Sequence, residues 1–189
     1  ASVRYLRWRH KNNKHKMRAL FLEGNSSMNI RVDGTAFSNS MHKEIAQSVF
    51  GQSKNPNKNY VFTHGVAREG FHMSMCMFAL HYFFENSKTL HSFLKNISEC
   101  TRLNGYFIGT CFDGSQIFEF LYKRQNGTLI QKDESVRIDK NGRKMFEITK
   151  LYDTNIEEFK PDESSIGMPI RVYQESIDKP FMEYLVHFE

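Results

Sequence analysis

The sequence predicts an α/β fold with a mostly parallel sheet, helices on both faces, and a late antiparallel β insert. Two apolar runs of strand length, at 71–79 and 106–112, are each followed by a segment with helical periodicity, at 87–103 and 113–124. This strand–helix–strand–helix order is typical of parallel strands joined by right-handed crossovers. Beyond residue 130 the pattern changes to short alternating segments with turn signals, which predict antiparallel strands.

The length and composition fit a globular domain. The chain has 189 residues, of which 40% are hydrophobic, and this is enough for one domain with a buried core. We expect a single partial domain over 1–189, divided into an α/β core part at 1–130 and an antiparallel insert at 131–189. Three cysteines without metal-ligand spacing predict free thiols in a reducing compartment. No run approaches the roughly 20 apolar residues that a membrane span needs.

The amino-terminal segment is basic. Residues 2–16 have the pattern of a weakly amphipathic helix, and the seven Lys or Arg from Arg4 to Arg18 have no acidic residue among them. Such a segment can attract phosphate and lie along an RNA chain. It can equally be the solvated face of a helix, and the residues leave both interpretations open.

A strand and a helix are predicted next. The short apolar run 19–22 reads as a strand, closed by Gly24. Apolar residues at four-residue spacing predict a helix over 41–50, with Ser40 as its amino-terminal cap. Gly51 stands where a left-handed carboxyl-terminal cap belongs.

The central elements are the most regular. The first long apolar run has no polar alternation, which is typical of a strand covered on both faces. Asn86 or Ser87 starts a helix whose apolar face includes Leu103 and which ends at Asn104–Gly105. The run 106–112 then predicts a second buried strand.

The insert carries hairpin signals. Asn141–Gly142 separates two alternating segments, and this dipeptide is a strong signal for a β-hairpin. An acidic loop at 154–165 follows. The segments 170–176 and 181–188 read as a second antiparallel pair.

Ligands of a parallel sheet bind beyond the carboxyl ends of its strands. Polar and aromatic residues converge at two such ends, 24–27 and 78–82. The chain has no G-x-G-x-x-G or Walker-type loop, and no Ser–His–acid arrangement with a recognisable nucleophile turn. On residue type alone, His81 is more often a packed or capping histidine than a catalytic one.

Several motifs carry a family resemblance. The segment 71–110, with His-Tyr at 81–82 and Gly-Tyr-Phe-Ile-Gly-Thr at 105–110, resembles the mRNA cap (guanine-N7) methyltransferases. Cys-Phe-Asp-Gly at 111–114 and the segment 168–188 are similar to the versions found in capping enzymes of large DNA viruses.

The resemblance runs from about Arg4 to Phe188. It implies a partial Rossmann-like class I methyltransferase sheet. It also implies a function in mRNA capping, the transfer of a methyl group from S-adenosylmethionine to N7 of the guanine cap. The implied partner is the capped 5′ end of mRNA, with no membrane involved. The implied location is the cytoplasm, in a viral factory or virion, or the nucleus if the protein is cellular.

The resemblance also assigns substrate-binding residues. Phe78 and His81 would line the guanine pocket, and Tyr82 would sit between cofactor and cap. Glu183 would bind the guanine edge, because N1–H and N2–H₂ form a donor pair that fits one carboxylate. Without the resemblance, an exposed glutamate on an edge strand would be the more ordinary interpretation of Glu183.

The assigned cofactor-binding residues are Asn25, Met77, Phe78 and Tyr82. Asn25 stands in the place of an Asp that faces the adenine, and Met77 in the place of a Gln. Both departures remove polar contacts to the cofactor. His72, where the family has Asp, is expected to have a structural effect only.

The family's glycine-rich cofactor loop and its ribose-binding acid should precede Ala1, and its closing helix and strands should follow Glu189. We therefore expect a fragment that alone binds the cofactor poorly and is inactive. We also expect rearranged pairing, a partner chain or a stimulatory subunit at an exposed sheet edge.

The implied reaction needs no general base, because N7 of neutral guanine carries a lone pair and no proton. Positioning and electrostatics would suffice, so no nucleophile is expected and no residue is assigned as catalytic in the strict sense. Two alternatives remain. The first, motivated by Asn25 and Met77, is a catalytically degenerate domain that binds capped RNA or a partner. The second, a small-molecule methyltransferase, fits His81 and Glu183 less well.

Overall fold

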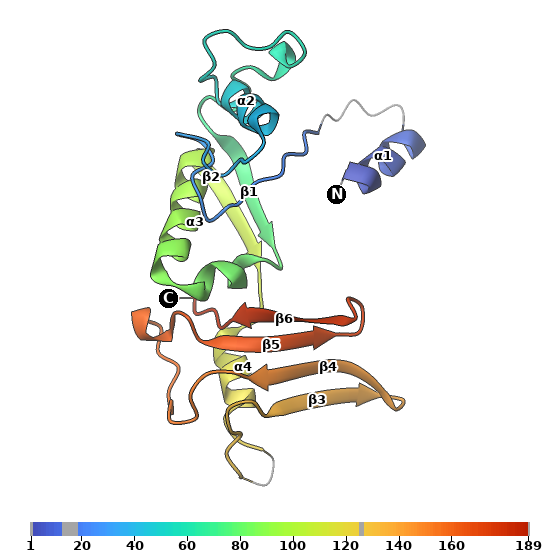
Figure 1. Ribbon diagram of the computed structural model, residues 1–189, viewed down its shortest axis with the longest axis vertical. Coiled ribbons are helices and arrows are strands. Elements are labelled where there is room, and N and C mark those ends of the chain that lie inside the picture. Colours follow the sequence, from blue (N-terminus) through green and yellow to red (C-terminus); the bar gives the residue numbers. More distant parts are fainter. Residues whose placement is uncertain (1, 13–18, 125–126, 189) are drawn as a thin grey trace. The chain divides into compact units, whose positions relative to one another are not determined.

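The computed structural model describes residues 2–12, 19–124 and 127–188. It divides into two compact units, Ala1–Arg68 and Glu69–Glu189, whose elements are labelled in Figure 1. Among the described residues, no helix is long and apolar enough to cross a membrane.

The first unit is helical in its described part. It contains α1 (Ser2–Lys11), α2 (Ser40–Val49) and a 3-10 turn, η1 (Val61–Thr63). The cap of α2 is Asn39, whose side chain accepts hydrogen bonds from two amides of the first turn. The prediction of Ser40 as the cap is therefore wrong by one residue, because Asn39 keeps the extended backbone that a capping residue needs.

The strand predicted at 19–22 is not present, since the structure describes 19–25 without regular secondary structure. The described residues of this unit contain no strand with which the run could form a ladder. Leu20 is 43% exposed, and the ring of Phe21 lies 5.6 Å from that of Tyr5 on α1. The prediction of a strand here is wrong.

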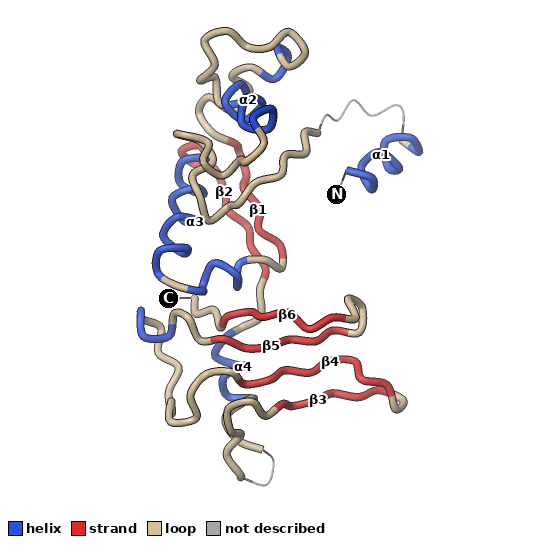
Figure 2. The backbone as a smooth tube through the Cα atoms, in the orientation of Figure 1, coloured by secondary structure: helices blue, strands red, loops and turns tan. Residues whose placement is uncertain are grey.

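The second unit begins with a parallel pair of strands, β1 (Phe71–Met77) and β2 (Thr101–Thr110). The helix α3 (Ser87–Cys100) forms the connection between them and packs beside β2 (Figure 2). The register runs to the last residues of both strands, with Met77 opposite Thr110. The predicted α/β order with parallel strands is confirmed.

The start of α3 follows the sequence signal, and its end does not. Asn86 accepts a hydrogen bond from the amide of Thr89, whose hydroxyl accepts one from the Asn86 amide, forming a capping box. The helix ends at Cys100, because the β-branched Thr101 already pairs with the first residue of β1. Leu103, predicted on the apolar helix face, lies in β2 and is 90% exposed.

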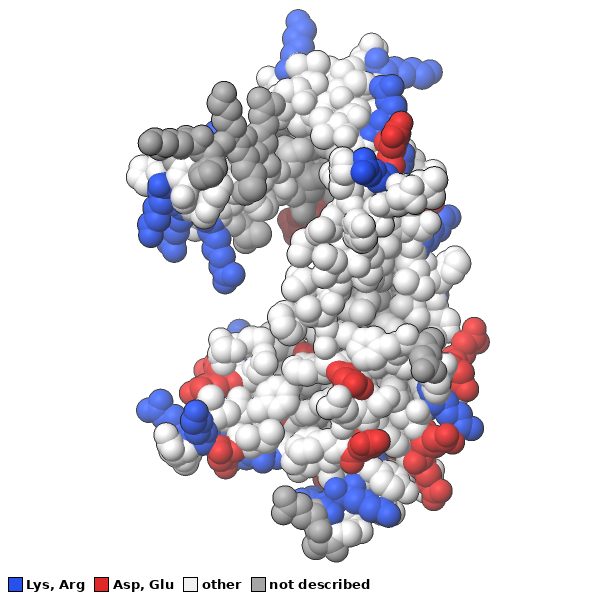
Figure 3. Space-filling view, turned by 180° about the vertical axis from the view of Figure 1, so that it is seen from behind, with Lys and Arg blue, Asp and Glu red and all other residues white. Residues whose placement is uncertain are grey.

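The β1–β2 pair is also more exposed than predicted. Met75 is 61% exposed and Tyr106 is 69% exposed, so within the described residues the strands are not covered on both faces. β1 has no charged residue apart from the titratable His72, and β2 has only Arg102. Figure 3 accordingly shows largely uncharged surface over this part of the second unit.

The rest of the second unit is a four-stranded antiparallel sheet. Its strands are β3 (Ser135–Lys140), β4 (Arg143–Lys150), β5 (Pro169–Gln174) and β6 (Lys179–Tyr184), in the order β3-β4-β5-β6. Asn141–Gly142 forms the β3–β4 turn with positive φ at both residues, as expected for a two-residue hairpin loop. The predicted antiparallel insert is confirmed.

A helix and this sheet enclose the core of the second unit. The helix α4 (Gly114–Phe120) is capped by Asp113 and packs on one face of the sheet, while η3 (Glu163–Ser165) lies in the acidic loop before β5. The buried cluster between helix and sheet consists of Phe118, Leu121, Ile148, Tyr152, Met168, Ile170, Val172 and Leu185.

Candidate functional site

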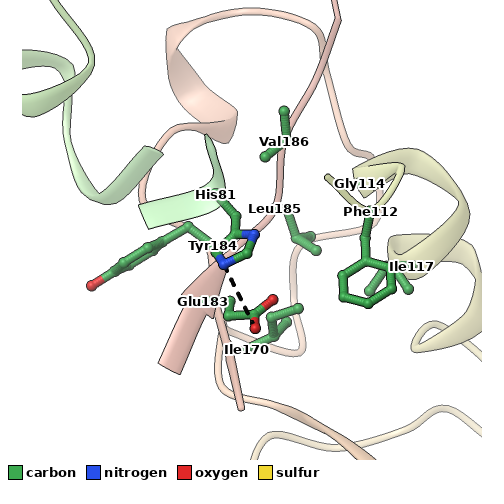
Figure 4. Close-up of a pocket in the computed structure, with 9 residues that line it drawn as sticks. All are labelled: His81, Phe112, Gly114, Ile117, Ile170, Glu183, Tyr184, Leu185 and Val186. Atoms are coloured by element: carbon green, nitrogen blue, oxygen red, sulfur yellow. Dashed lines mark ion pairs between the residues drawn. The ribbon is translucent and has the colours of Figure 1, made fainter. Parts of the chain in front are cut away.

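Two buried polar side chains meet in the second unit. His81 lies in η2 (Leu80–Glu85), the 3-10 turn after β1, and is 5% exposed. Glu183 lies on β6 and is 8% exposed. Nε2 of His81 is 3.6 Å from Oε1 of Glu183, as Figure 4 shows. The structure thus brings together two residues that are far apart in the sequence and that were predicted to share a site.

The polar atoms of this pair are not satisfied by the described residues. Both ring nitrogens of His81 and Oε2 of Glu183 are buried without a hydrogen-bond partner. The 3.6 Å separation is too long for a hydrogen bond between the two. Because buried polar atoms in proteins nearly always have partners, this cluster can accommodate a ligand with a polar edge.

Burial shifts the pKa of both groups toward their neutral forms. It lowers the pKa of His81 to about 4 and raises the pKa of Glu183 to about 7. Two full charges at this distance would attract each other, but the loss of hydration opposes both charges. In mildly acidic solution the favoured state is therefore a neutral imidazole beside a neutral carboxyl group.

A small pocket adjoins the pair and opens to solvent. The walls away from the pair are apolar, and Figure 4 shows Phe112 and Ile117 on the side of α4. Ile170 is directly opposite Glu183 in the sheet and shares its face. These wall residues were not predicted from the sequence, although the alternation of β5 and β6 could have indicated Ile170.

Gly114 fixes one edge of this pocket. Its amide donates a hydrogen bond of 3.0 Å to the carbonyl of Val186, just beyond β6. A Cβ atom at this position would lie 2.3 Å from that carbonyl oxygen. Only glycine allows the start of α4 to approach the chain beyond β6 this closely.

Aromatic residues flank His81 in the chain. Tyr82 is 43% exposed, and its ring packs edge-on against His81 with 4.3 Å between centroids. Burial and the charge of Glu183 raise the pKa of Tyr82. Phe78 is 67% exposed and has a left-handed backbone with φ of 52°. This conformation costs a bulky residue roughly 1–2 kcal/mol, and such strain is typical of functional sites.

The remaining predicted cofactor residues lie in different units. Met77 is the last residue of β1 and is 48% exposed. Asn25 belongs to the first unit, where its side chain accepts a hydrogen bond of 2.9 Å from the amide of Ser27. The assignment of Asn25 to the adenine therefore stays a prediction.

Met77, Phe78 and Tyr82 present exposed apolar and aromatic surface at the carboxyl end of a parallel strand. Such a surface can pack against a flat ring, and its aromatic faces can attract a cationic group. Among the described residues, no group of three or more His, Cys, Asp or Glu is placed to hold a metal ion.

The parallel strands with their crossover helix, and the pocket beyond the end of β1, form an α/β arrangement that is consistent with a Rossmann-like fold. The family model of the mRNA (guanine-N(7))-methyltransferase domain matches residues 1–189. The chain belongs to this methyltransferase family.

A viral relative supports the same assignment. The chain is 34% identical over 116 residues to a protein of Acanthamoeba polyphaga mimivirus described as "Probable mRNA-capping enzyme". The match covers 59% of this chain and 9% of the viral protein, so the chain spans less than a tenth of that relative. The resemblance to viral cap methyltransferases is confirmed.

Proposed function

We propose that this chain belongs to an enzyme that transfers a methyl group from S-adenosylmethionine to N7 of the guanine cap of mRNA. The observation that carries this proposal is the buried pair of His81 and Glu183, whose polar atoms lack partners beside an apolar pocket. A purine with a polar edge supplies both the missing hydrogen bonds and the missing apolar contacts. Family membership makes the cap guanine the substrate that fits.

Glu183 would recognise the edge of the guanine. Its two carboxylate oxygens can accept hydrogen bonds from N1–H and N2–H₂, which lie side by side on the base. The ring becomes cationic when N7 is methylated, so the carboxylate stabilises the transition state more than the substrate. Binding must ionise the carboxyl group, because a protonated oxygen cannot accept both hydrogen bonds.

His81 would act as a neutral donor. Because burial lowers its pKa to about 4, the imidazole is uncharged at neutral pH and has one N–H to donate. We propose that this N–H binds O6 of the guanine. A neutral donor is suitable here because a cationic imidazole would oppose the positive charge that develops on the ring.

The remaining residues would hold the reactants in line. S-adenosylmethionine, when bound, supplies an activated methyl group on a sulfonium. Met77 and Phe78 would contact this cofactor, while Tyr82 would separate it from the cap and pack along the base. Alignment of this kind can contribute about 7–11 kcal/mol to catalysis, and base stacking on an aromatic ring about 1–3 kcal/mol. No residue of the site needs to act as a nucleophile or general base.

The protonation of Glu183 makes activity depend on pH. Its pKa in the free site is raised to about 7, and only the ionised form binds guanine productively. We therefore expect kcat/KM for the dinucleotide cap GpppA to rise with pH and to level off above about pH 7.5. The Glu183→Gln variant should show no such rise.

The direct test is methyl transfer by the intact protein from labelled S-adenosylmethionine to GpppA. We expect kcat/KM to fall about 100-fold in Glu183→Gln and about tenfold in His81→Asn. Matched controls are Glu147→Gln, on β4 and paired with Lys144, and His91→Asn, exposed on α3. Both controls should retain full activity.

Two outcomes would contradict the proposal. Transfer to guanine that is unchanged in both site variants would refute the assigned site. Binding of GpppA without any transfer by the wild-type protein would instead favour the degenerate, cap-binding alternative.

A further inference from the structure

Thr110 is the last residue of β2 and makes two contacts beyond the strand ladder. Its hydroxyl accepts a hydrogen bond of 3.0 Å from the amide of Phe78 and donates one to Sδ of Met77 at 4.0 Å. A hydroxyl group has one hydrogen to donate and two lone pairs, so both contacts can form at once. One side chain therefore contacts two successive residues at the carboxyl end of β1.

The amide of Phe78 is held by Thr110 alone among the described residues. It is shared between the Thr110 carbonyl oxygen, at 2.9 Å, and the Thr110 hydroxyl. This double contact fixes the residue at which the chain leaves β1 with φ of 52°. A bulky residue adopts this conformation only where its surroundings impose it.

The direction of the backbone decides where these side chains point. Phe78 is 67% exposed and Met77 is 48% exposed, so packing alone does not lock either side chain. The same turn leads directly into η2, which carries His81 and Tyr82. A change in the turn would therefore move the rings of Phe78 and Tyr82, which we place beside the reacting groups.

We propose that Thr110 is a positioning residue for methyl transfer, whose hydroxyl holds Phe78 in the orientation that aligns cap and cofactor. This inference rests on the proposed function of the site. Thr110 does not itself contact the substrate, and it acts through Phe78. The hydroxyl makes no contact with His81 or Glu183, so its loss should affect kcat more than the binding of guanine.

The test compares Thr110→Val, which keeps the shape and removes the hydroxyl, with Thr110→Ser, which keeps the hydroxyl. In the intact protein we expect Thr110→Val to lower kcat on GpppA about tenfold, with the Kd of GpppA changed by less than about threefold and the binding stoichiometry unchanged. Thr110→Ser should stay within about twofold of wild type. A matched control is Thr101→Val at the other end of β2, where the hydroxyl bonds Ser74 at 2.6 Å. This control should leave kcat unchanged.

A double-mutant cycle separates positioning from general destabilisation. Glycine adopts positive φ without strain, so Phe78→Gly removes both the ring and the need to hold it. If Thr110 acts through Phe78, Thr110→Val should cause less than a twofold further loss of kcat in the Phe78→Gly background.

Three results would overturn the inference. The first is full activity of Thr110→Val in an active protein. The second is the same tenfold loss in both backgrounds. Each of these leaves the proposed function intact. The third, a wild-type protein that does not methylate GpppA, would refute the proposed function and this inference together.

Discussion

The two β structures of the second unit differ in how they are stabilised. The antiparallel sheet and α4 enclose a contiguous core in which Leu121, Ile148 and Ile170 are at most 2% exposed. The parallel pair has α3 beside it, yet Met75 is 61% exposed and Tyr106 is 69% exposed. The antiparallel sheet is thus supported by its own packing, whereas the β1–β2 pair leaves much of its apolar surface uncovered.

This difference indicates how the site is divided. The well-packed sheet contributes Glu183, a buried carboxyl group whose position is fixed by β6 and by the wall residue Ile170 opposite it. The end of the exposed strand leads to Phe78 and Tyr82, which are both exposed. We infer that both structures bind the guanine, through Glu183 and through His81, and that the strand end also aligns the reaction.

The largest effect on stability should come from a substitution in the core of the antiparallel sheet. Leu121 has 0% exposure, so Leu121→Ala removes buried methyl groups and leaves a cavity. We expect the free energy of unfolding to fall by about 3 kcal/mol. Urea unfolding followed by circular dichroism measures it, and a loss below about 1 kcal/mol would contradict a tightly packed core.

The next effect concerns Glu183 and has the opposite sign. Its folded-state pKa is raised from 4.5 to about 7, so the folded protein binds the proton more tightly than the unfolded chain. Stability is therefore lost as pH rises from about 4.5 to about 7. Glu183→Gln should be more stable than wild type by about 1–3 kcal/mol at pH 8, with the difference vanishing near pH 4.

Thermal unfolding of both proteins across this pH range measures the Glu183 effect. Glu147→Gln serves as the control, since Lys144 and Ser135 bind that carboxylate and lower its pKa. That variant should lose stability at pH 8. A Glu183→Gln variant that is less stable than wild type at pH 8 would show that the buried carboxyl group is satisfied in the folded protein.

A third prediction concerns His81, whose pKa is lowered from 6.5 to about 4. Here the unfolded chain binds the proton more tightly, so stability is lost as pH falls from about 6.5 to about 4. Over this range the free energy of unfolding of His81→Asn should fall by about 1–2 kcal/mol less than that of the wild type. Between pH 4.5 and 6.5 the contributions of His81 and Glu183 oppose each other. The gain in stability over wild type should therefore grow toward high pH in Glu183→Gln and toward low pH in His81→Asn. Gains that do not change with pH would contradict the assignment.

The smallest effect on stability should come from the exposed β1–β2 pair of strands. Leu103 on β2 is 90% exposed, so Leu103→Ser removes almost no buried apolar surface. We expect the free energy of unfolding to change by less than about 0.5 kcal/mol, in contrast to Leu121→Ala. The same urea titration measures it. A loss of 2 kcal/mol or more in the intact protein would mean that this face is covered there.

Elements with strong local signals were predictable from the sequence. Asn86 begins α3, Asn141–Gly142 forms the hairpin turn, and Gly51 has the expected left-handed backbone with φ of 72°. In each case the side chain or its absence satisfies a local requirement of the backbone. Such requirements do not depend on distant parts of the chain.

Features that depend on distant partners were not predictable. The run 19–22 lacks a neighbouring strand among the described residues, and α3 ends at Cys100 because Thr101 pairs with β1. The pairing of His81 with Glu183 was expected only through the family resemblance. The left-handed backbone of Phe78 had no local sequence signal, and the amide of Phe78 bonds Thr110, which is distant in sequence and lies on the adjacent strand.

Central to the proposed function is that Glu183 accepts hydrogen bonds from N1–H and N2–H₂ of the cap guanine. The most direct test compares kcat/KM for GpppA with that for the same dinucleotide carrying hypoxanthine, which lacks the N2 amino group. We expect the wild-type protein to prefer guanine by about 10–100-fold and Glu183→Gln to show a ratio near one. An equal preference for guanine in both proteins would contradict the account.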